Sequence, residues 1–180
     1  MCERWDVLPD GEREQWALEP FESVGPLRFG MLIDEVSNTL SRHTGDLQRY
    51  SGPCLAEDPY GLVTGRYRSF GLTLYYWDER LRGVSADALR GPQVTVEGVA
   101  LTGRAPSAVG KWLWGRGEGL APGSELAIMG GGDFCSESLG VVIGTQRAGD
   151  RLLTRPVFFP AEGLRNLYDF LPDEAFRISG

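Results

Sequence analysis

The stretch Gly71-Leu72-Thr73-Leu74-Tyr75-Tyr76-Trp77 indicates a β-strand, because aromatic and β-branched side chains fit a pleated, half-buried surface. Asp78-Glu79-Arg80 follows as a turn, and Leu81 to Ser85 reads as the partner strand. The sequence therefore predicts an antiparallel hairpin here, and we interpret the rest of the chain outward from it.

A helix is expected before this hairpin, from about Leu32 to Arg42. Val36 and Leu40 fall on one stripe of it, and Asp34 and Glu35 lie in its first turn, where acidic residues favour the helix dipole. The stretch from Thr44 to Ser69 is rich in glycine and proline, which predicts a loop with a short strand near 62–67.

The second half of the chain repeats this order. A strand is predicted from Gln93 to Leu101, a helix opens at Pro106-Ser107, and a second hairpin spans about 140–152. The spacing also repeats, because Val36 follows Gly30 by six residues and Val109 follows Gly103 by six. We interpret residues 24–90 and 91–160 as an internal duplication, with chance similarity of two ordinary units as the alternative.

Residues 1–23 are acidic and broken by prolines, which suggests an N-terminal arm with a short helix over 12–18. Residues 156–160 read as an edge strand limited by its prolines, and 161–171 as a C-terminal helix that covers the sheet. The fold class expected for residues 24–180 is a single α+β domain. It would combine two helix-plus-antiparallel-hairpin units in one continuous antiparallel sheet with the helices on one face.

Composition excludes several kinds of function. Eighteen basic residues against 25 acidic ones give a net charge of −7, so the chain has no cationic field to hold a nucleic acid. One histidine and three scattered cysteines argue against a zinc site or a common hydrolytic triad, and we expect no metal, no cofactor and no catalysis. Seven acidic residues but two arginines lie in residues 1–22, so most of the negative charge belongs to the expected arm.

The expected compartment is the cytoplasm. The chain begins without a signal-like apolar segment, and its apolar runs are too short to cross a membrane. The odd number of cysteines, without CxxC spacing, is typical of reduced thiols.

The segment Leu27-Arg28-Phe29-Gly30-Met31-Leu32-Ile33-Asp34-Glu35-Val36 resembles the opening of the β-lactamase-inhibitory and BamE-type repeats. Leu32 stands where that pattern has a helix-capping Ser or Thr, and the second copy, from Leu101 to Val109, keeps the Gly and the Val alone. The opening is also similar to that of small actinobacterial immunity-type proteins. The resemblance implies a binding module with a helix on an antiparallel sheet, duplicated in the inhibitory proteins, and it transfers no functional residue.

These observations predict a non-catalytic protein that neutralises a partner enzyme or toxin, through an acidic and aromatic surface suited to a basic protein. The side chains expected to bind this partner are those of Tyr75, Trp77, Asp78, Glu79, Asp133, Phe134 and Glu137.

An alternative is a structural or interaction subunit, which a stable homodimer in light scattering would indicate. Two other hypotheses also remain open at this point. One is a small-molecule or enzymatic pocket between sheet and loops, lined by Tyr75, Trp112 and the loop at Gly130. The other is a nucleophile and base formed by Cys135 and His43, with Asp133 or Asp46 orienting the imidazole.

Overall fold

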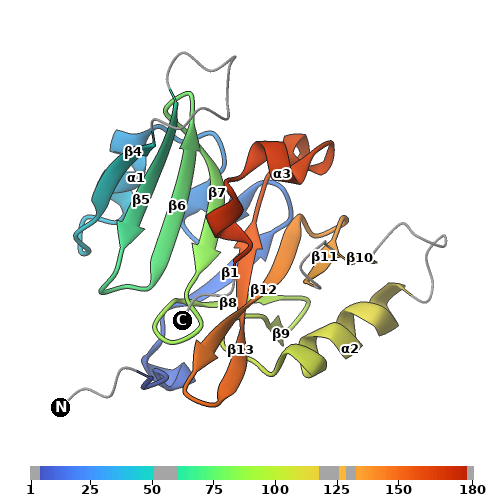
Figure 1. Ribbon diagram of the computed structural model, residues 1–180. Helices are drawn as coiled ribbons and strands as arrows, with labels where there is room; N and C mark the ends of the chain where they lie inside the picture. Colours follow the sequence, from blue (N-terminus) through green and yellow to red (C-terminus); the bar gives the residue numbers. More distant parts are fainter. Residues whose placement is uncertain (1–4, 51–60, 118–125, 129–132, 178–180) are drawn as a thin grey trace.

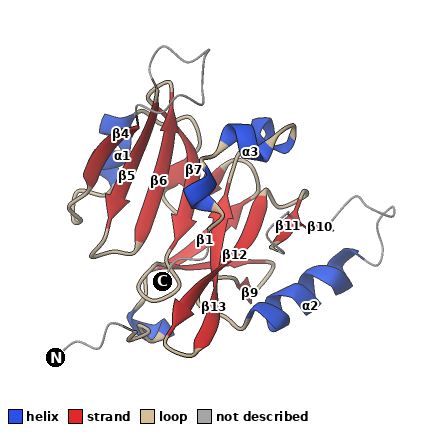
Figure 2. Ribbon diagram, in the orientation of Figure 1, coloured by secondary structure: helices blue, strands red, loops and turns tan. Residues whose placement is uncertain are grey.

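The computed structural model describes residues 5–50, 61–117, 126–128 and 133–177, and the account below concerns these residues. The chain is a mixed α and β protein in which strands predominate (Figure 2). They form one sheet of eight strands and one of five.

The eight-stranded sheet is antiparallel throughout and runs from β4 on the left of Figure 1 to β10 on the right. Its strands, in spatial order, are β10 (Leu126–Ile128), β11 (Phe134–Ser136), β12 (Val141–Ala148), β13 (Arg151–Phe158), β7 (Arg80–Ala86), β6 (Leu72–Trp77), β5 (Leu62–Tyr67) and β4 (Asp46–Tyr50).

This sheet contains the same order of elements twice. Helix α1 (Ile33–Thr39) precedes the meander β4 to β7, and helix α2 (Pro106–Gly117) precedes the meander β10 to β13. The last strands of the two meanders, β7 and β13, pair at the centre of the sheet through Val84 with Phe158 and Ser85 with Val157. Each unit thus has a helix and four strands, where the sequence predicted a helix and a hairpin.

The five-stranded sheet corrects the expectation of one continuous sheet. Its strands are β3 (Leu27–Arg28), β2 (Ser23–Val24), β1 (Gln15–Glu19), β8 (Gln93–Val96) and β9 (Val99–Ala100) in spatial order. The predicted helix over 12–18 is wrong, because Gln15–Glu19 is a strand that alternates exposed and buried residues and runs parallel to β8. Trp16 and Leu18 are the buried positions, so their expected inward direction is confirmed.

Helices α1 and α2 and the five-stranded sheet pack on the same face of the eight-stranded sheet, where the larger core lies. Alternate residues of each strand enter this core, for example Leu74 and Tyr76 of β6, while Tyr75 between them faces the other way. The predicted stripe of α1 is confirmed by the burial of Val36 and Leu40, and α2 buries Val109 and Leu113.

The opposite face is covered by the end of the chain: η2 (Ala161–Leu164), α3 (Leu167–Phe170) and η3 (Asp173–Ala175). Leu167, Leu171 and Ala175 form a second core with Tyr75 and its neighbours, so the C-terminal segment covers the sheet as expected. It does so through separate short helical turns, which corrects the single helix predicted over 161–171. Leu171 fits into a depression that Gly83 leaves, since a Cβ on Gly83 would lie 2.7 Å from its Cδ2 atom.

The segment before β1, which includes η1 (Asp10–Glu12), is held by a buried arginine. The Arg13 guanidinium donates hydrogen bonds to the carbonyl oxygens of Leu8 at 2.9 Å, Ala88 at 2.8 Å, Leu89 at 3.0 Å and Gly91 at 2.6 Å. Burial lowers the Arg13 pKa from its ordinary value, and Asp10 opposes that effect. One side chain thus attaches residues 8–13 to the loop after β7.

Candidate functional site

The turn between β6 and β7 holds two acidic residues in a strained backbone. Trp77 pairs with Arg80, so Asp78 and Glu79 alone form the turn, with φ angles of 51° and 57°. Two-residue hairpin turns with both residues in the left-handed region strongly prefer Asn-Gly or Asp-Gly, because other side chains are strained there. Both acidic residues are exposed, so the hairpin presents two carboxylates to solvent at some cost in backbone energy.

Residues Gly30 to Leu32 run beside this turn. The Gly30 N–H donates to the Leu81 carbonyl at 2.8 Å, the Leu81 N–H donates to the Met31 carbonyl at 2.8 Å, and Leu32 forms a bridge with Arg80. Arg80 Nη1 also donates to the Gly30 carbonyl at 3.0 Å. Leu32, which is 41% exposed, therefore lies next to the acidic turn.

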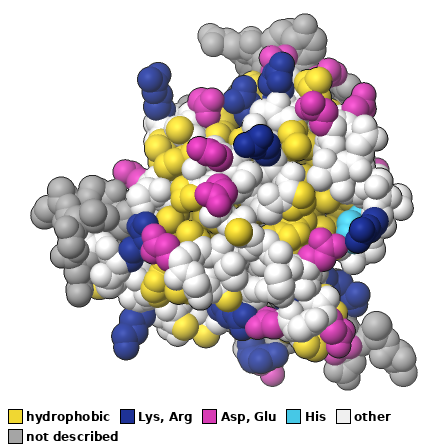
Figure 3. Space-filling model, turned by 180° about the vertical axis from the view of Figure 1, so that it is seen from behind, with side chains coloured by type: hydrophobic (Ala, Val, Ile, Leu, Met, Phe, Trp, Pro, Cys, Tyr) yellow, Lys and Arg dark blue, Asp and Glu magenta, His cyan; other side chains and the backbone are white. Residues whose placement is uncertain are grey.

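The first turn of α1 adds a further carboxylate. Glu35 Oε2 accepts the Leu32 N–H at 2.7 Å and so satisfies the backbone donor at the start of α1. Asp34 is exposed beside it. We define the acidic tip surface as Leu32, Asp34, Asp78 and Glu79. Viewed from behind, the top of the molecule, the end at which this hairpin turns, carries acidic side chains with basic ones among them (Figure 3).

Leu32 and Asp34 were missed by the sequence reasoning, which placed them in an ordinary helix start. Their position depends on the bridge to Arg80, 48 residues away from Leu32, and no local pattern encodes such a pairing. The one available signal was the leucine at a position where the resembled pattern has Ser or Thr.

Behind the turn, Tyr75 lies in the core rather than on the surface where the sequence placed it. Its side chain is 1% exposed and packs in the second core, and burial raises its pKa to about 12. Trp77, on the same face of β6, is half-buried against the same core. These two aromatic residues anchor in the second core the strand that leads into the turn.

The other three predicted contact residues lie elsewhere in the sheet. Asp133, Phe134 and Glu137 belong to β11 and its flanks, and β12, β13 and β7 separate that strand from β6. The Phe134 ring packs against α2, where a Cβ on Gly110 would lie 2.7 Å from it, and Glu137 is exposed. The structure therefore does not bring them together with Asp78 and Glu79.

Asp133 faces Arg155 across Gly144. A Cβ on Gly144 would lie 3.9 Å from Asp133 Oδ2, and Gly144 pairs with Arg155 on β13. Burial raises the Asp133 pKa, and the Arg155 charge partly offsets this rise. Arg155 is itself 7% exposed and donates from Nη2 to the carbonyls of Ala175 at 3.0 Å and Arg177 at 2.7 Å. Arg155 thereby attaches the C-terminal segment to the sheet.

Cys135 and His43 do not form a nucleophile and base. Cys135 is buried in the second core, and burial, followed by the charge of Glu137, raises its pKa to about 11, which favours the thiol. The imidazole of His43 stacks on Phe70 with ring centroids 3.8 Å apart, and its Nε2 atom lies 3.5 Å from Glu14 Oε1. Phe70 belongs to the larger core, on the other side of the sheet from Cys135.

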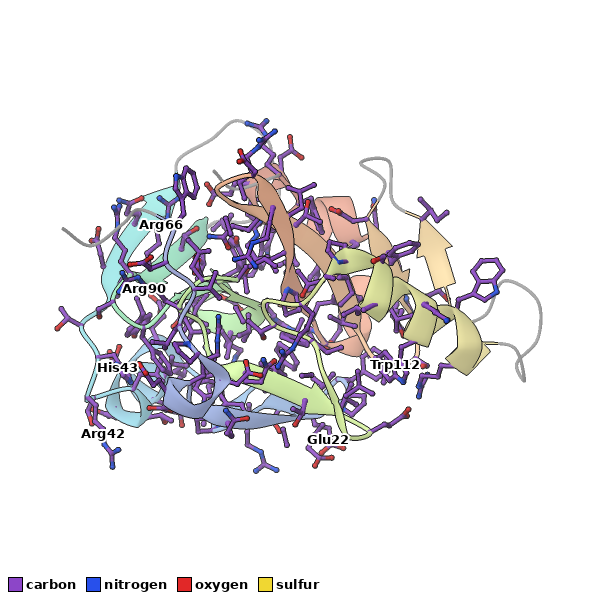
Figure 4. The ribbon with its side chains drawn as sticks, turned by 90° about the horizontal axis from the view of Figure 1, so that it is seen from below. Glu22, Arg42, His43, Arg66, Arg90 and Trp112 are labelled. Atoms are coloured by element: carbon purple, nitrogen blue, oxygen red, sulfur yellow. The ribbon has the colours of Figure 1, made fainter. Side chains whose placement is uncertain are left out.

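The residues of the expected small-molecule pocket are also separated. Tyr75 belongs to the second core, whereas Trp112 on α2 packs against the larger one. Figure 4, seen from below, places Trp112 and His43 at opposite sides of the molecule. The loop at Gly130 lies outside the described residues. Within the described ranges, no three His, Cys, Asp or Glu side chains are grouped as a metal ion would need.

Comparison with known proteins assigns no family to the chain. No protein-family model, no curated protein and no solved structure matches the chain significantly. In the part of the chain that the structure describes, none of the helices combines the length and the apolar composition of a membrane span.

Proposed function

We propose that this protein is a non-catalytic binding protein that neutralises a partner enzyme or toxin, and that the acidic tip surface contacts a basic site on that partner. The observation that carries the proposal is the backbone of Asp78 and Glu79. Left-handed backbone costs about 1–2 kcal/mol for a residue such as Glu79, whereas aspartate tolerates it, so a glycine in place of Glu79 would avoid most of that cost. Strain retained at an exposed turn is typical of a functional position.

The chemistry of the surface fits a basic protein. Asp34, Asp78 and Glu79 are exposed carboxylates, and such groups raise the rate of association with a cationic site. Leu32 adds an exposed apolar side chain among these carboxylates. Such a surface can attract a basic partner by its charge and then bury the leucine side chain in the contact. The seven acidic residues of positions 1–22 extend the negative charge of the chain as a whole.

The repeated order of helix and four-stranded meander supports the same proposal. The segment from Leu27 to Val36 resembles repeats that are duplicated in inhibitory proteins, and here this segment leads into α1 and runs beside the acidic turn. The proposal takes the class of function from this resemblance and the contact residues from the geometry of the turn.

The test separates binding from folding. Asp78→Asn with Glu79→Gly gives the turn its preferred residues and removes both charges, so this variant should fold at least as well as the wild type. The partner to try is the product of the adjacent gene, with association measured by titration calorimetry at low and at moderate salt. We expect the double variant to bind at least roughly tenfold more weakly, and the wild type to lose affinity as salt rises.

Asp150→Asn is the matched control, because Asp150 is an exposed acid in the two-residue turn of the β12–β13 hairpin. It should bind as the wild type does. Absence of association at low salt, or equal affinity of the double variant and the wild type, would overturn the proposal.

A further inference from the structure

The two outer strands of the eight-stranded sheet differ in whether charged residues protect them against pairing with a further strand. Strand β4 carries Asp46 and Arg49, whereas β10 is Leu126-Ala127-Ile128 and has no charged residue. Among the described residues, β4 pairs with β5 alone and β10 with β11 alone, so each has one open edge. Proteins normally protect open edges with charged residues, because unpaired backbone groups recruit another strand. The β10 edge lacks that protection.

The side chains next to the β10 edge are the most exposed large apolar groups of the described structure. Ile128 is 68% exposed and Trp114, on α2, is 64% exposed. Ile128 pairs with Phe134, whose ring packs against Gly110, and Trp114 follows Gly110 by one helical turn on the same side of α2. Trp114, Phe134 and Ile128 therefore form one apolar surface beside the open edge. The elements that carry them, α2, β11 and β10, lie at the right of Figure 1.

This surface is held in place by Arg116, which lies in the same last turn of α2 as Trp114. Arg116 donates to the Glu97 carboxylate from Nε at 2.8 Å and from Nη2 at 2.7 Å, and its Nη1 donates to Ser138 Oγ at 2.6 Å. The last turn of α2 is thus attached to the β8–β9 turn and to the turn after β11. A fixed helix loses little freedom on binding, which favours association through Trp114.

We propose that a second copy of this chain occupies the surface, with the β10 strands of the two copies paired antiparallel about a two-fold axis. An axis perpendicular to the sheet leaves both α2 helices on the same side, so Trp114 and Ile128 of one copy face those of the other. The paired edges satisfy each other's backbone groups.

The charge distribution favours a second copy at this place over other places on the molecule. Among the described residues, the charged side chains of α2 are Lys111 and Arg116, and Arg116 pairs with Glu97, whereas the whole chain has a net charge of −7. Two copies of an acidic chain repel each other least where no excess of acidic side chains faces the partner. Trp is also the side chain most enriched at the energetic centre of interfaces.

Sedimentation of the full chain over a roughly hundredfold range of concentration tests the proposal. We expect the mass to rise from 19.8 kDa towards twice that value. Trp114→Ser and Ile128→Ser should each raise the dimer dissociation constant at least roughly tenfold. Leu152→Ser is the control, because Leu152 is 45% exposed near the β12–β13 turn, and it should leave the dimer unchanged.

The melting temperatures of both variants, measured under dimer-free conditions, should stay near that of the wild type, since these side chains are exposed. A wild type that stays monomeric overturns the proposal. A dimer that persists in both the Trp114→Ser and the Ile128→Ser variant overturns the proposal as well. So does a dimer that dissociates on Leu47→Ser, since Leu47 is exposed on the β4 edge. Binding of the product of the adjacent gene involves the acidic tip surface, so it should persist in the Trp114→Ser variant. The proposed function and the proposed dimer can therefore fail independently of each other.

Discussion

Glu97 and Arg116 form a two-point ion pair that joins the β8–β9 turn to the last turn of α2. Glu97 has a φ angle of 51°, so its backbone is strained in the same sense as that of Asp78 and Glu79. The Glu97 carboxylate pairs with the Arg116 guanidinium, so this strained position is stabilised by an ion pair within the protein.

The Glu97–Arg116 pair predicts an acid-dependent loss of stability. Hydrogen bonds from Arg116 lower the Glu97 pKa below its ordinary value of 4.5, so the stabilisation is present above that value and is lost as the pH falls through the folded-state pKa. Glu97→Gln should lower the free energy of unfolding at neutral pH by about 1 kcal/mol or less, because the pair is partly exposed. Thermal unfolding from neutral to acidic pH should show this difference shrinking. A difference that is the same at every pH would contradict the prediction, and Glu19→Gln serves as the control.

Replacing the β6–β7 turn by its preferred residues should stabilise the fold. Asp78→Asn with Glu79→Gly relieves the left-handed position of Glu79, because aspartate and asparagine both tolerate that backbone, and we expect a gain of about 1 kcal/mol after the entropy cost of the added glycine. Urea unfolding measures it. Asp78→Ala with Glu79→Ala removes the same charges but keeps the strain, so it should show no such gain. Equal stability of the two double variants would mean that charge repulsion, rather than backbone strain, is the cost.

Asp133→Asn should raise the melting temperature at neutral pH. Burial raises the Asp133 pKa above 3.8, so the folded state binds this proton more tightly than the unfolded state does, and stability falls as the pH rises through the folded-state value. The asparagine variant has no such loss. The higher stability of the variant should disappear below pH 3.8, where Asp133 of the wild type is protonated in both the folded and the unfolded state. Calorimetry at several pH values checks this, and a variant less stable than the wild type at neutral pH would contradict it.

Arg155→Met should destabilise the protein and loosen the C-terminal segment. The substitution removes two hydrogen bonds from a buried cation to the carbonyls of Ala175 and Arg177, and we expect a loss of about 2 kcal/mol. Limited proteolysis should then cleave within residues 171–177 faster than in the wild type. Arg147→Met, at an exposed arginine of β12, is the control. Unchanged cleavage would mean that Leu171 and Ala175 hold the segment without Arg155.

Elements with a local signal were predicted well. The hairpins β6–β7 and β12–β13 and the helices α1 and α2 lie where the hydrophobic periodicity placed them, because periodicity and turn residues depend on neighbours in sequence. The proline-limited edge strand at 156–160 is instead the end of β13. Pro156 is tolerated there because β13 pairs with β7 only from Val157 onward.

The remaining parts depend on contacts between distant residues. Trp16 and Leu18 alternate with exposed residues, and this alternation in the sequence could have indicated a strand. The acidic and proline-rich surroundings favoured a helical interpretation. For the candidate site, Asp78 and Glu79 could be recognised at a turn from sequence. Their left-handed backbone and the adjacency of Leu32 could not, since both arise from strand register.

The parallel pairing of β1 with β8 has a consequence for the way the chain is made. Gln15 pairs with Gln93, which is synthesised 78 residues later, so β1 leaves the ribosome long before its partner exists. Until then Trp16 and Leu18 lack the neighbouring strand that helps to bury them, and the nascent chain exposes them to chaperones or to other chains. The three strands β1 to β3 can pair early, but the five-stranded sheet can be completed only after the first meander has been synthesised.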